Sequence, residues 1–262
     1  MILTINSGNT MTNFALMEKG TLRHEFKCFN SPVRTADEYF AWLMPLIHHI
    51  GCSYSDILGC VLASVVPEAK ANLIQFATQY IKGPLHILSS AHPNIGIKVL
   101  VDPSADVGAD MLASTIGAYT HYGQKPCIVV DCGTATTATC VDAFGNFVGT
   151  MIAPGFKTAM MALCNNAALL PTMTFDRPRA IIGKNTMDAI NAGMYFGYSG
   201  LVEGLVKAAK EFMETALGFA SQQVPVIGTG GYLSCVGAQG IDHKDDQLVF
   251  KGLWEFYMRA CQ

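Results

Sequence analysis

The stretch Ile128-Val-Val-Asp-Cys-Gly-Thr-Ala-Thr-Thr-Ala-Thr-Cys-Val141 decides the fold of this 262-residue chain. Residues Ile128 to Val130 predict a buried strand, because β-branched side chains pack well on a pleated surface. Hydroxyl and apolar side chains alternate from Thr136 to Val141, which predicts a second strand with one packed face. Asp131 and Gly133 fall between the two strands. An ordinary β-hairpin with glycine in its turn is one interpretation, and a phosphate-binding turn is the other.

The chemistry of this turn favours phosphate. Gly133 lets backbone N–H groups point toward an anion, and the Thr134 hydroxyl adds a donor. A carboxylate beside a phosphate cradle requires a cation between the two charges, which makes Asp131 a candidate metal ligand. A later glycine-rich turn at 228–231 follows a predicted strand, and Gly230 would let the backbone approach a flat ligand closely.

A second copy of the same layout lies at the N-terminus, in Ile2-Leu-Thr-Ile-Asn-Ser-Gly-Asn-Thr-Met-Thr-Asn-Phe-Ala-Leu16. Aligning Gly8 with Gly133 places Asn6 on Asp131 and Thr12 on Thr137. The separation of the two copies is close to half of the chain. The sequence therefore predicts a duplicated α/β unit with two domains, 1–115 and 116–262.

Composition narrows the class of protein. Half of the residues are apolar, and the formal net charge is −3 without a block of basic residues, so we expect neither a nucleic-acid partner nor a membrane surface. No apolar run approaches the ~18 residues of a spanning helix. The nine cysteines contain no Cys-x-x-Cys pair, which favours reduced thiols and a cytoplasmic location.

Periodicity and capping residues predict the remaining elements. Strands are expected at 21–28, 59–66, 85–88, 147–153 and 224–227. Helices are expected after a cap at Thr35 or Asp37, and over 67–80, 112–122, 157–166, 186–217 and 248–260. The helix after Thr186 carries a face without side chains, which predicts either a contact between subunits or close packing inside the domain. Its glycines are Gly193, Gly197, Gly200 and Gly204.

Asp110 begins the helix that contains Leu112 and Ile116. Its carboxylate could simply pair with the positive end of the helix dipole. Alternatively, it faces a cleft and accepts a hydroxyl proton.

The order of these motifs resembles one family over nearly the whole chain. The motifs are the turn at Gly8, Gly108-Ala-Asp110, Asp131-Cys-Gly-Thr-Ala-Thr-Thr137, Gly183-Lys-Asn-Thr186 and Gly228-Thr-Gly-Gly231. In this order they are similar to type III pantothenate kinases, within the acetate and sugar kinase, Hsp70 and actin superfamily. The resemblance implies a duplicated actin-like, ribonuclease H-like ATPase fold, with two α/β domains around a central cleft.

The resemblance also implies a role for individual residues. ATP would be held by a first loop and by three residues of the second half: Asn6, Ser7, Gly8, Asn9, Thr10, Met11, Thr12 and Asn13, then Gly133, Thr134 and Gly230. Asp131 would hold a monovalent cation, K⁺ or NH₄⁺. Pantothenate would bind at Leu100, Gly108, Ala109, Asp110, Met111 and Thr186. Asp110 would accept the proton of the substrate hydroxyl.

The implied reaction is ATP-dependent phosphorylation of pantothenate to 4′-phosphopantothenate, the first step toward coenzyme A. It would use Mg²⁺, and Thr186 would be supplied across a homodimer interface. Three positions depart from the family's usual residues: Asn6 replaces Asp, Leu100 replaces Tyr and Met111 replaces Arg. These departures leave two alternatives open, a catalytically weakened nucleotide-binding paralogue with a regulatory or partner role, and a kinase for a more apolar hydroxylated substrate.

Overall fold

The computed structural model describes residues 1–166, 174–235, 237 and 239–262. The chain is an α/β protein that divides into two compact units, each built on a five-stranded sheet. The first unit contains residues 1–124, 145–147 and 247–262, and the second contains 125–144 and 148–246. The C-terminal helix therefore belongs to the first unit. The division into domains 1–115 and 116–262 stays a prediction.

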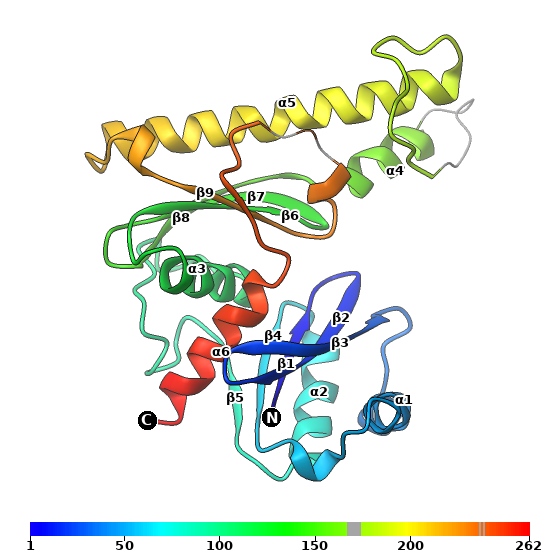
Figure 1. The fold of residues 1–262 in the computed structure, drawn as a ribbon, viewed down its shortest axis with the longest axis vertical. Coiled ribbons are helices and arrows are strands. Elements are labelled where there is room, and N and C mark those ends of the chain that lie inside the picture. Colours follow the sequence, from blue (N-terminus) through cyan, green and yellow to red (C-terminus); the bar gives the residue numbers. More distant parts are fainter. Residues whose placement is uncertain (167–173, 236, 238) are drawn as a thin grey trace. The chain divides into compact units, whose positions relative to one another are not determined.

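The first sheet has the strand order β3-β2-β1-β4-β5 (Figure 1). Its strands are β1 (Ile2–Ser7), β2 (Met11–Glu18), β3 (Thr21–Phe29), β4 (Cys60–Ser64) and β5 (Leu85–Ile87). β1, β2 and β3 form an antiparallel meander, whereas β4 pairs parallel with both β1 and β5. Parallel neighbours need a crossover connection, and helices precede both β4 and β5 along the chain. All five strands were predicted.

The second sheet repeats this connectivity in the order β10-β9-β6-β7-β8. Its strands are β6 (Cys127–Cys132), β7 (Ala135–Val141), β8 (Phe147–Pro154), β9 (Val226–Thr229) and β10 (His243–Lys244). β6 pairs antiparallel with β7 and parallel with β9, as β1 does with β2 and β4. The strand-for-strand correspondence confirms the predicted duplicated α/β fold. β10 was not predicted, because two exposed residues carry no periodic signal.

The strand registers correct two details of the sequence analysis. Ser7 pairs with Thr12 in the first hairpin and Cys132 pairs with Thr136 in the second, so Thr12 corresponds to Thr136 and not to Thr137. The second turn is shorter by one residue, which an ungapped alignment cannot detect. β9 also extends through Thr229, so the glycine-rich turn begins at Gly230.

Two helices cover each face of the first sheet (Figure 1). They are α1 (Ala36–His49) and α2 (Pro67–Tyr80) on one face, and α3 (Ala109–His121) and α6 (Leu248–Ala260) on the other. Side chains of a strand alternate between the faces, so Leu3 and Ile5 pack with α1 and α2, while Ile2 packs with α3 and α6. Thr35 caps α1: its hydroxyl accepts the Glu38 N–H, and the Glu38 carboxylate accepts the Thr35 N–H.

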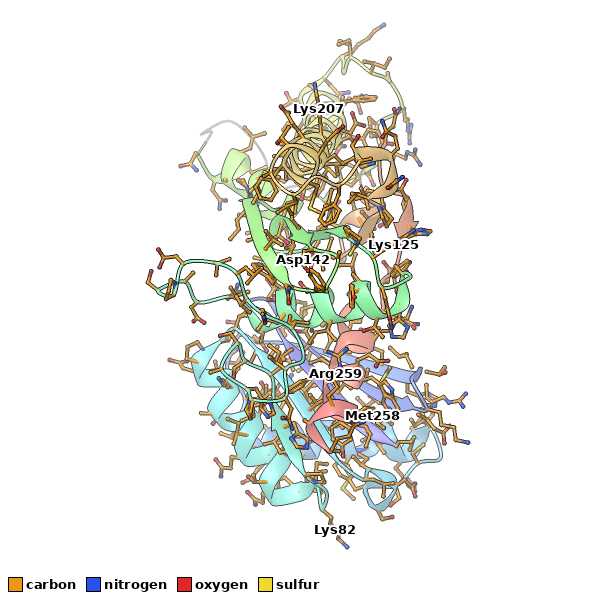
Figure 2. All side chains as sticks on the ribbon, turned by 90° about the vertical axis from the view of Figure 1, so that its left-hand side faces the viewer. Lys82, Lys125, Asp142, Lys207, Met258 and Arg259 are labelled. Atoms are coloured by element: carbon orange, nitrogen blue, oxygen red, sulfur yellow. The ribbon has the colours of Figure 1, made fainter. Side chains whose placement is uncertain are left out.

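The C-terminal helix α6 is tied tightly to its own unit. The guanidinium of Arg259, labelled in Figure 2, donates to the carbonyl of Ile95 and to the hydroxyl of Thr120, each at 3.3 Å. α6 crosses α3 where both helices carry glycine. A Cβ on Gly117 would lie 2.5 Å from the Leu248 carbonyl oxygen, and a Cβ on Gly252 would overlap the Ala113 carbonyl oxygen.

The second unit has its own hydrophobic core between the sheet and two helices, α4 (Phe156–Asn166) and α5 (Thr186–Thr215). Ile128 and Val130 of β6 pack there with Val202 and Val206 of α5. Three short 3-10 helices complete the described elements of the two units, and none of them was predicted: η1 (Tyr54–Asp56), η2 (Ser221–Gln223) and η3 (Leu233–Cys235).

The crossing of α3 and α6 predicts that Gly252→Ala lowers the free energy of unfolding. Within a helix, alanine is more favourable than glycine by about 1 kcal/mol. Forcing its methyl group into this crossing costs about 1–3 kcal/mol, and we expect this cost to dominate. Urea denaturation followed by circular dichroism measures the change. Gly149→Ala is the control, because a Cβ there meets no described atom within 4 Å. An unchanged or raised stability of Gly252→Ala would contradict the close crossing.

Candidate functional site

The first predicted phosphate loop lies at the carboxyl end of β1. The Gly8 N–H donates to the Met11 carbonyl at 3.0 Å and closes the turn, and Asn9 and Thr10 are exposed at its tip. Val65, directly after β4, donates its N–H to the Ser7 carbonyl at 3.0 Å. The loop therefore stands where the carboxyl ends of two parallel strands meet, which is the edge that binds ligands in open α/β sheets.

One face of this hairpin presents two side-chain amides. Asn6 and Asn13 pair across β1 and β2, so their side chains share a face. Their strand neighbours on that face, Ile2 and Ala15, pack with α3 and α6. Both Oδ1 atoms are buried, and neither accepts a hydrogen bond from any residue that the structure describes. A buried acceptor without a donor costs about 1–3 kcal/mol, so these oxygens suit a cation or its bound water.

The opposite face of the hairpin holds a buried network that sequence reasoning missed. Ser7 and Thr12 pair across the strands and are 1% and 0% exposed. The Thr12 hydroxyl donates to Oδ1 of Asn30, and Ser7 Oγ forms a hydrogen bond with the Thr12 hydroxyl at 2.9 Å. Thr12 therefore turns its hydroxyl into the unit, and direct contact of Thr12 with nucleotide stays a prediction. Asn30, just after β3, carried no motif that could have identified it.

Asp110 occupies the first turn of α3, whose N-cap is Gly108. Its Oδ1 accepts the Met111 N–H at 2.8 Å. Burial raises the pKa of the Asp110 carboxyl, and the hydrogen bond from Met111 opposes this rise. A Cβ on Gly108 would lie 2.6 Å from Asp110 Oδ1 and 3.4 Å from the Val65 side chain. Val65 thus places the start of α3 beside the carboxyl end of β1.

The other predicted substrate residues of the first unit differ in exposure. Ala109 is buried among α3, α6 and the sheet. Met111 is half-buried, and the side chain of Leu100 is 51% exposed while its N–H donates to the Phe147 carbonyl at 2.8 Å. Leu100 is therefore free to present an apolar surface to a ligand.

In the second unit, two glycines lie close to the side chain of Asp131. β6 carries Asp131 next to Thr229 of β9, again at the carboxyl ends of two parallel strands. Gly230 follows with φ of 97°, and a Cβ there would overlap Asp131 Oδ1 and lie 2.6 Å from the Cys132 nitrogen. A Cβ on Gly133 would be 3.4 Å from the same carboxylate oxygen. Both glycines leave space around the carboxylate that side chains would fill.

The turn after Asp131 rests on the start of α4. Thr158 donates its hydroxyl to the Thr134 carbonyl at 2.7 Å. A Cβ on Gly155 would overlap the Gly133 and Thr134 carbonyl oxygens, so glycine is required for this approach. The Pro154-Gly155 pair therefore fixes the turn that carries the predicted phosphate contacts.

Thr186 begins α5, and Asn185 caps that helix by accepting the Asp188 N–H at 2.9 Å. Thr186 is exposed, and Ile181 and Ile182 before it are more than 70% exposed. No described atom lies within 4 Å of a Cβ placed on Gly193, Gly197, Gly200 or Gly204. This result excludes close packing of the glycine face inside the described part of the second unit.

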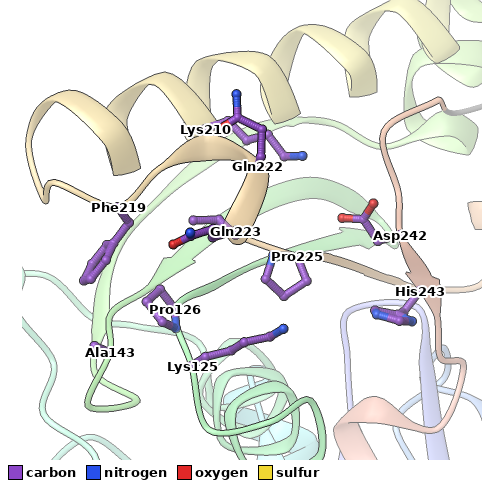
Figure 3. Close-up of a pocket in the computed structure, with 11 residues that line it drawn as sticks. Lys125, Pro126, Ala143, Lys210, Phe219, Gln222, Gln223, Pro225, Asp242 and His243 are labelled. Carbon is purple, nitrogen blue, oxygen red and sulfur yellow. The ribbon is translucent and has the colours of Figure 1, made fainter.

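One cavity of the second unit lies away from these residues (Figure 3). It has a volume of about 550 Å³ and is lined by Lys125, Pro126, Pro225, Asp242 and His243, among others. Pro126 and Pro225 directly precede β6 and β9, so the cavity is at the amino ends of the strands whose carboxyl ends carry Asp131 and Thr229. None of the predicted site residues lines it.

Comparison with known proteins identifies the family. The sequence profile of type III pantothenate kinase matches residues 2–208. This chain belongs to the type III pantothenate kinase family. It is 38% identical to a type III pantothenate kinase of Rhodospirillum rubrum over 261 residues, which cover 99% of this chain and 98% of that protein. The enzyme of Halalkalibacterium halodurans is 34% identical over 263 residues, with 99% of each chain covered.

Solved structures support the fold of this family member. The ethanolamine utilization protein EutJ of Carboxydothermus hydrogenoformans superposes with a TM-score of 0.53 at 12% identity, covering 97% of this chain and 89% of that one. Component A of the (R)-2-hydroxyglutaryl-CoA dehydratase of Acidaminococcus fermentans gives 0.53 at 10% identity, covering 99% and 98%. Within the described residues, no helix combines the length and the apolar character needed to cross a bilayer.

The position of Asp110 predicts a stability effect that depends on pH. Asp110→Asn keeps an acceptor for the Met111 N–H and removes a buried charge, so the thermal midpoint should rise at about pH 7.5. The folded-state pKa lies above the ordinary value of 3.8, so the folded wild type takes up a proton first as the pH falls. The gain should therefore shrink toward acidic pH, as measured by scanning fluorimetry. A lower midpoint at every pH would show that pairing with the helix dipole dominates.

Proposed function

We propose that this chain transfers the γ-phosphoryl group of ATP to the primary hydroxyl of pantothenate. The products are ADP and 4′-phosphopantothenate, and the reaction begins coenzyme A synthesis. The observation that carries the proposal is the half-buried Asp110 at the start of α3, in a chain whose residues 2–208 match the type III pantothenate kinase family.

Asp110 is the proton acceptor of the reaction. The substrate oxygen forms the new bond to the γ-phosphorus, the bond between that phosphorus and the β–γ bridging oxygen breaks, and the hydroxyl proton moves to the carboxylate. The transition state of phosphoryl transfer is loose, so the proton leaves late and the base mainly orients the hydroxyl. Burial raises the pKa of Asp110, which brings its basicity closer to neutral pH and strengthens it as a proton acceptor.

The loops at both sheet edges hold the phosphates of ATP. In the first unit, Asn9 and Met11 supply backbone N–H donors, whereas the N–H groups of Gly8 and Gly133 close their own turns by bonding to the Met11 and Ala135 carbonyls. In the second unit, Thr134 contributes from the turn after Asp131. Concave turns of this kind bind anions without a basic side chain. Gly230 packs closely against the turn after β6, and because it has no side chain, the nucleotide can approach the backbone there. Bound phosphates reach these donors directly because glycine leaves the turns uncovered.

Oxygen ligands at the same edges suit the two cations that such a reaction uses. Mg²⁺ keeps most of its water and takes few protein ligands, and the unpaired Oδ1 of Asn6 fits one of those waters or the ion itself. The carboxylate of Asp131, with the space that Gly133 and Gly230 leave beside it, fits K⁺ or NH₄⁺. When bound, both cations neutralise phosphate charge in the transition state.

Pantothenate lies against the start of α3. Gly108 leaves the Asp110 carboxylate uncovered, and the side chains of Met111 and Val65 beside Gly108 give this place an apolar surface. We place pantothenate there, with Leu100 and Ala109 as further predicted contacts. This surface suits the gem-dimethyl end of pantothenate, next to the hydroxyl that reacts. Thr186 closes over the substrate from a second copy of the chain.

A homodimer through α5 supplies that second copy. Gly193, Gly197, Gly200 and Gly204 form an open face on which nothing described packs, and Phe196 on the same face is 45% exposed. Small residues let two helices approach closely, and an exposed apolar face on a soluble helix indicates a partner.

The proposed location is the cytoplasm. The free thiols of all nine cysteines suit its reducing conditions.

Purified protein is expected to release ADP from ATP only when pantothenate is present. The assay contains Mg²⁺ and K⁺ and separates the nucleotides by chromatography, because coupling enzymes have cation requirements of their own. Asp110→Asn should lower kcat by about 100- to 10,000-fold, whereas Asp106→Asn, an exposed carboxylate in the preceding loop, should leave it unchanged. No pantothenate-dependent ADP over a wide range of ATP would refute the proposed reaction.

The α5 face predicts that Gly200→Arg converts the dimer to a monomer. A long charged side chain would separate two helices that approach through glycine. Sedimentation equilibrium should report the 28.1 kDa mass of one chain for this variant and twice that mass for the wild type. Leu58→Arg, at an exposed apolar position of the first unit, should remain dimeric. A wild-type protein that sediments as a monomer would exclude the interface.

A further inference from the structure

Asn30 makes an unusual number of contacts with one short loop. It lies directly after β3 and is 6% exposed. Its backbone N–H donates to the Thr10 carbonyl at 3.0 Å. Its side-chain amide donates to the Gly8 carbonyl and, at 3.3 Å, to Ser7 Oγ. Its Oδ1 accepts the hydroxyl of Thr12.

The orientation of the Asn30 amide follows from its partners. A carbonyl oxygen can only accept, so the NH₂ group must face Gly8 and the oxygen must face the Thr12 hydroxyl. Every polar group of the side chain is therefore used inside the hairpin. A residue in this position holds the loop and has no atom left to bind a ligand.

The direction of the loop carbonyls determines where the loop donors point. In a trans peptide, the N–H of the next residue points opposite to the carbonyl. Asn30 draws the Gly8 and Thr10 carbonyls toward itself, so the N–H groups of Asn9 and Met11 point away from it. These N–H groups are among the proposed phosphate donors.

We propose that Asn30 is a positioning residue that fixes the first phosphate loop with its N–H donors directed outward. The proposal rests on the proposed function, because it concerns the loop that binds ATP in that reaction. Asn30 belongs to the face of the hairpin with Ser7 and Thr12, whereas Asn6 and Asn13 occupy the other face. It therefore acts on ATP through the backbone and leaves the pantothenate residues untouched.

The test compares Asn30→Asp with the wild type in steady-state kinetics of ADP release. Aspartate has the same shape and keeps the acceptor for Thr12, but it loses both donors and places an oxygen against the Gly8 carbonyl. The KM for ATP should rise about tenfold or more, the effect of losing one well-buried hydrogen bond. The KM for pantothenate should stay within about twofold, since only the ATP loop moves.

Thr4→Val is the control, because Thr4 is likewise a buried polar residue that donates to a carbonyl of the β1–β2 hairpin, that of Ala15 at 3.1 Å, but it lies away from the loop. It should lower the thermal midpoint without changing the KM for ATP. Calorimetric titration with ATP alone reports nucleotide binding without turnover, and Asn30→Ala replaces Asn30→Asp if the latter does not fold. An active wild type with an unchanged KM for ATP in the Asn30 variant overturns the inference. A wild-type protein that binds ATP but is inactive contradicts the proposed function. In that case the calorimetric titration still tests the role of Asn30: a weaker affinity of the Asn30 variant for ATP supports the role, and an equal affinity refutes it.

Discussion

The central strand of each sheet has one antiparallel and one parallel neighbour, and the functional arrangement depends on this pairing. The antiparallel hairpin makes the chain turn at the carboxyl end of β1 or β6, where the glycine loops lie. The parallel partner ends at the same edge, so the backbone of Val65 reaches Ser7 and that of Gly230 reaches Asp131. In each unit, a turn of the backbone and a carboxylate, that of Asp110 or that of Asp131, therefore lie near the carboxyl end of the central strand.

Strand alternation then gives the two faces of the first hairpin different tasks. Ser7 and Thr12 turn inward and, with Asn30, satisfy one another in a buried network. Asn6 and Asn13 turn to the other face and leave their oxygens unpaired. A fully satisfied network is rigid, whereas an unpaired buried acceptor retains affinity for a donor or a cation. The residues that hold the loop, Ser7 and Thr12, therefore alternate along the strands with residues whose oxygens are unpaired, Asn6 and Asn13.

The two copies of the unit have diverged in charge while keeping their topology. Asp131 carries a carboxylate where the corresponding residue of the first copy is Asn6, and the carboxylate proposed as proton acceptor in the first unit comes instead from α3. Reactions with a loose transition state need positioned donors and neutralised phosphate charge more than a strong base. The loops proposed to hold the phosphates fit this requirement, because their donors are mainly backbone groups that strand pairing holds in place.

The sequence by itself determined the strands other than β10, the long helices, the duplication and the family, because periodicity, caps and glycine turns are local signals. It also placed Asp110, Asp131 and the first loop through their motifs. Asn30 could not be found this way, since its importance comes from contacts with Ser7, Gly8 and Thr12, which lie far from it in the chain. The equivalence of Thr12 with Thr136 likewise required the register, which a change of one residue in turn length alters. Only the tertiary structure decided which polar groups are buried, paired or left open, because those properties arise when distant segments pack together.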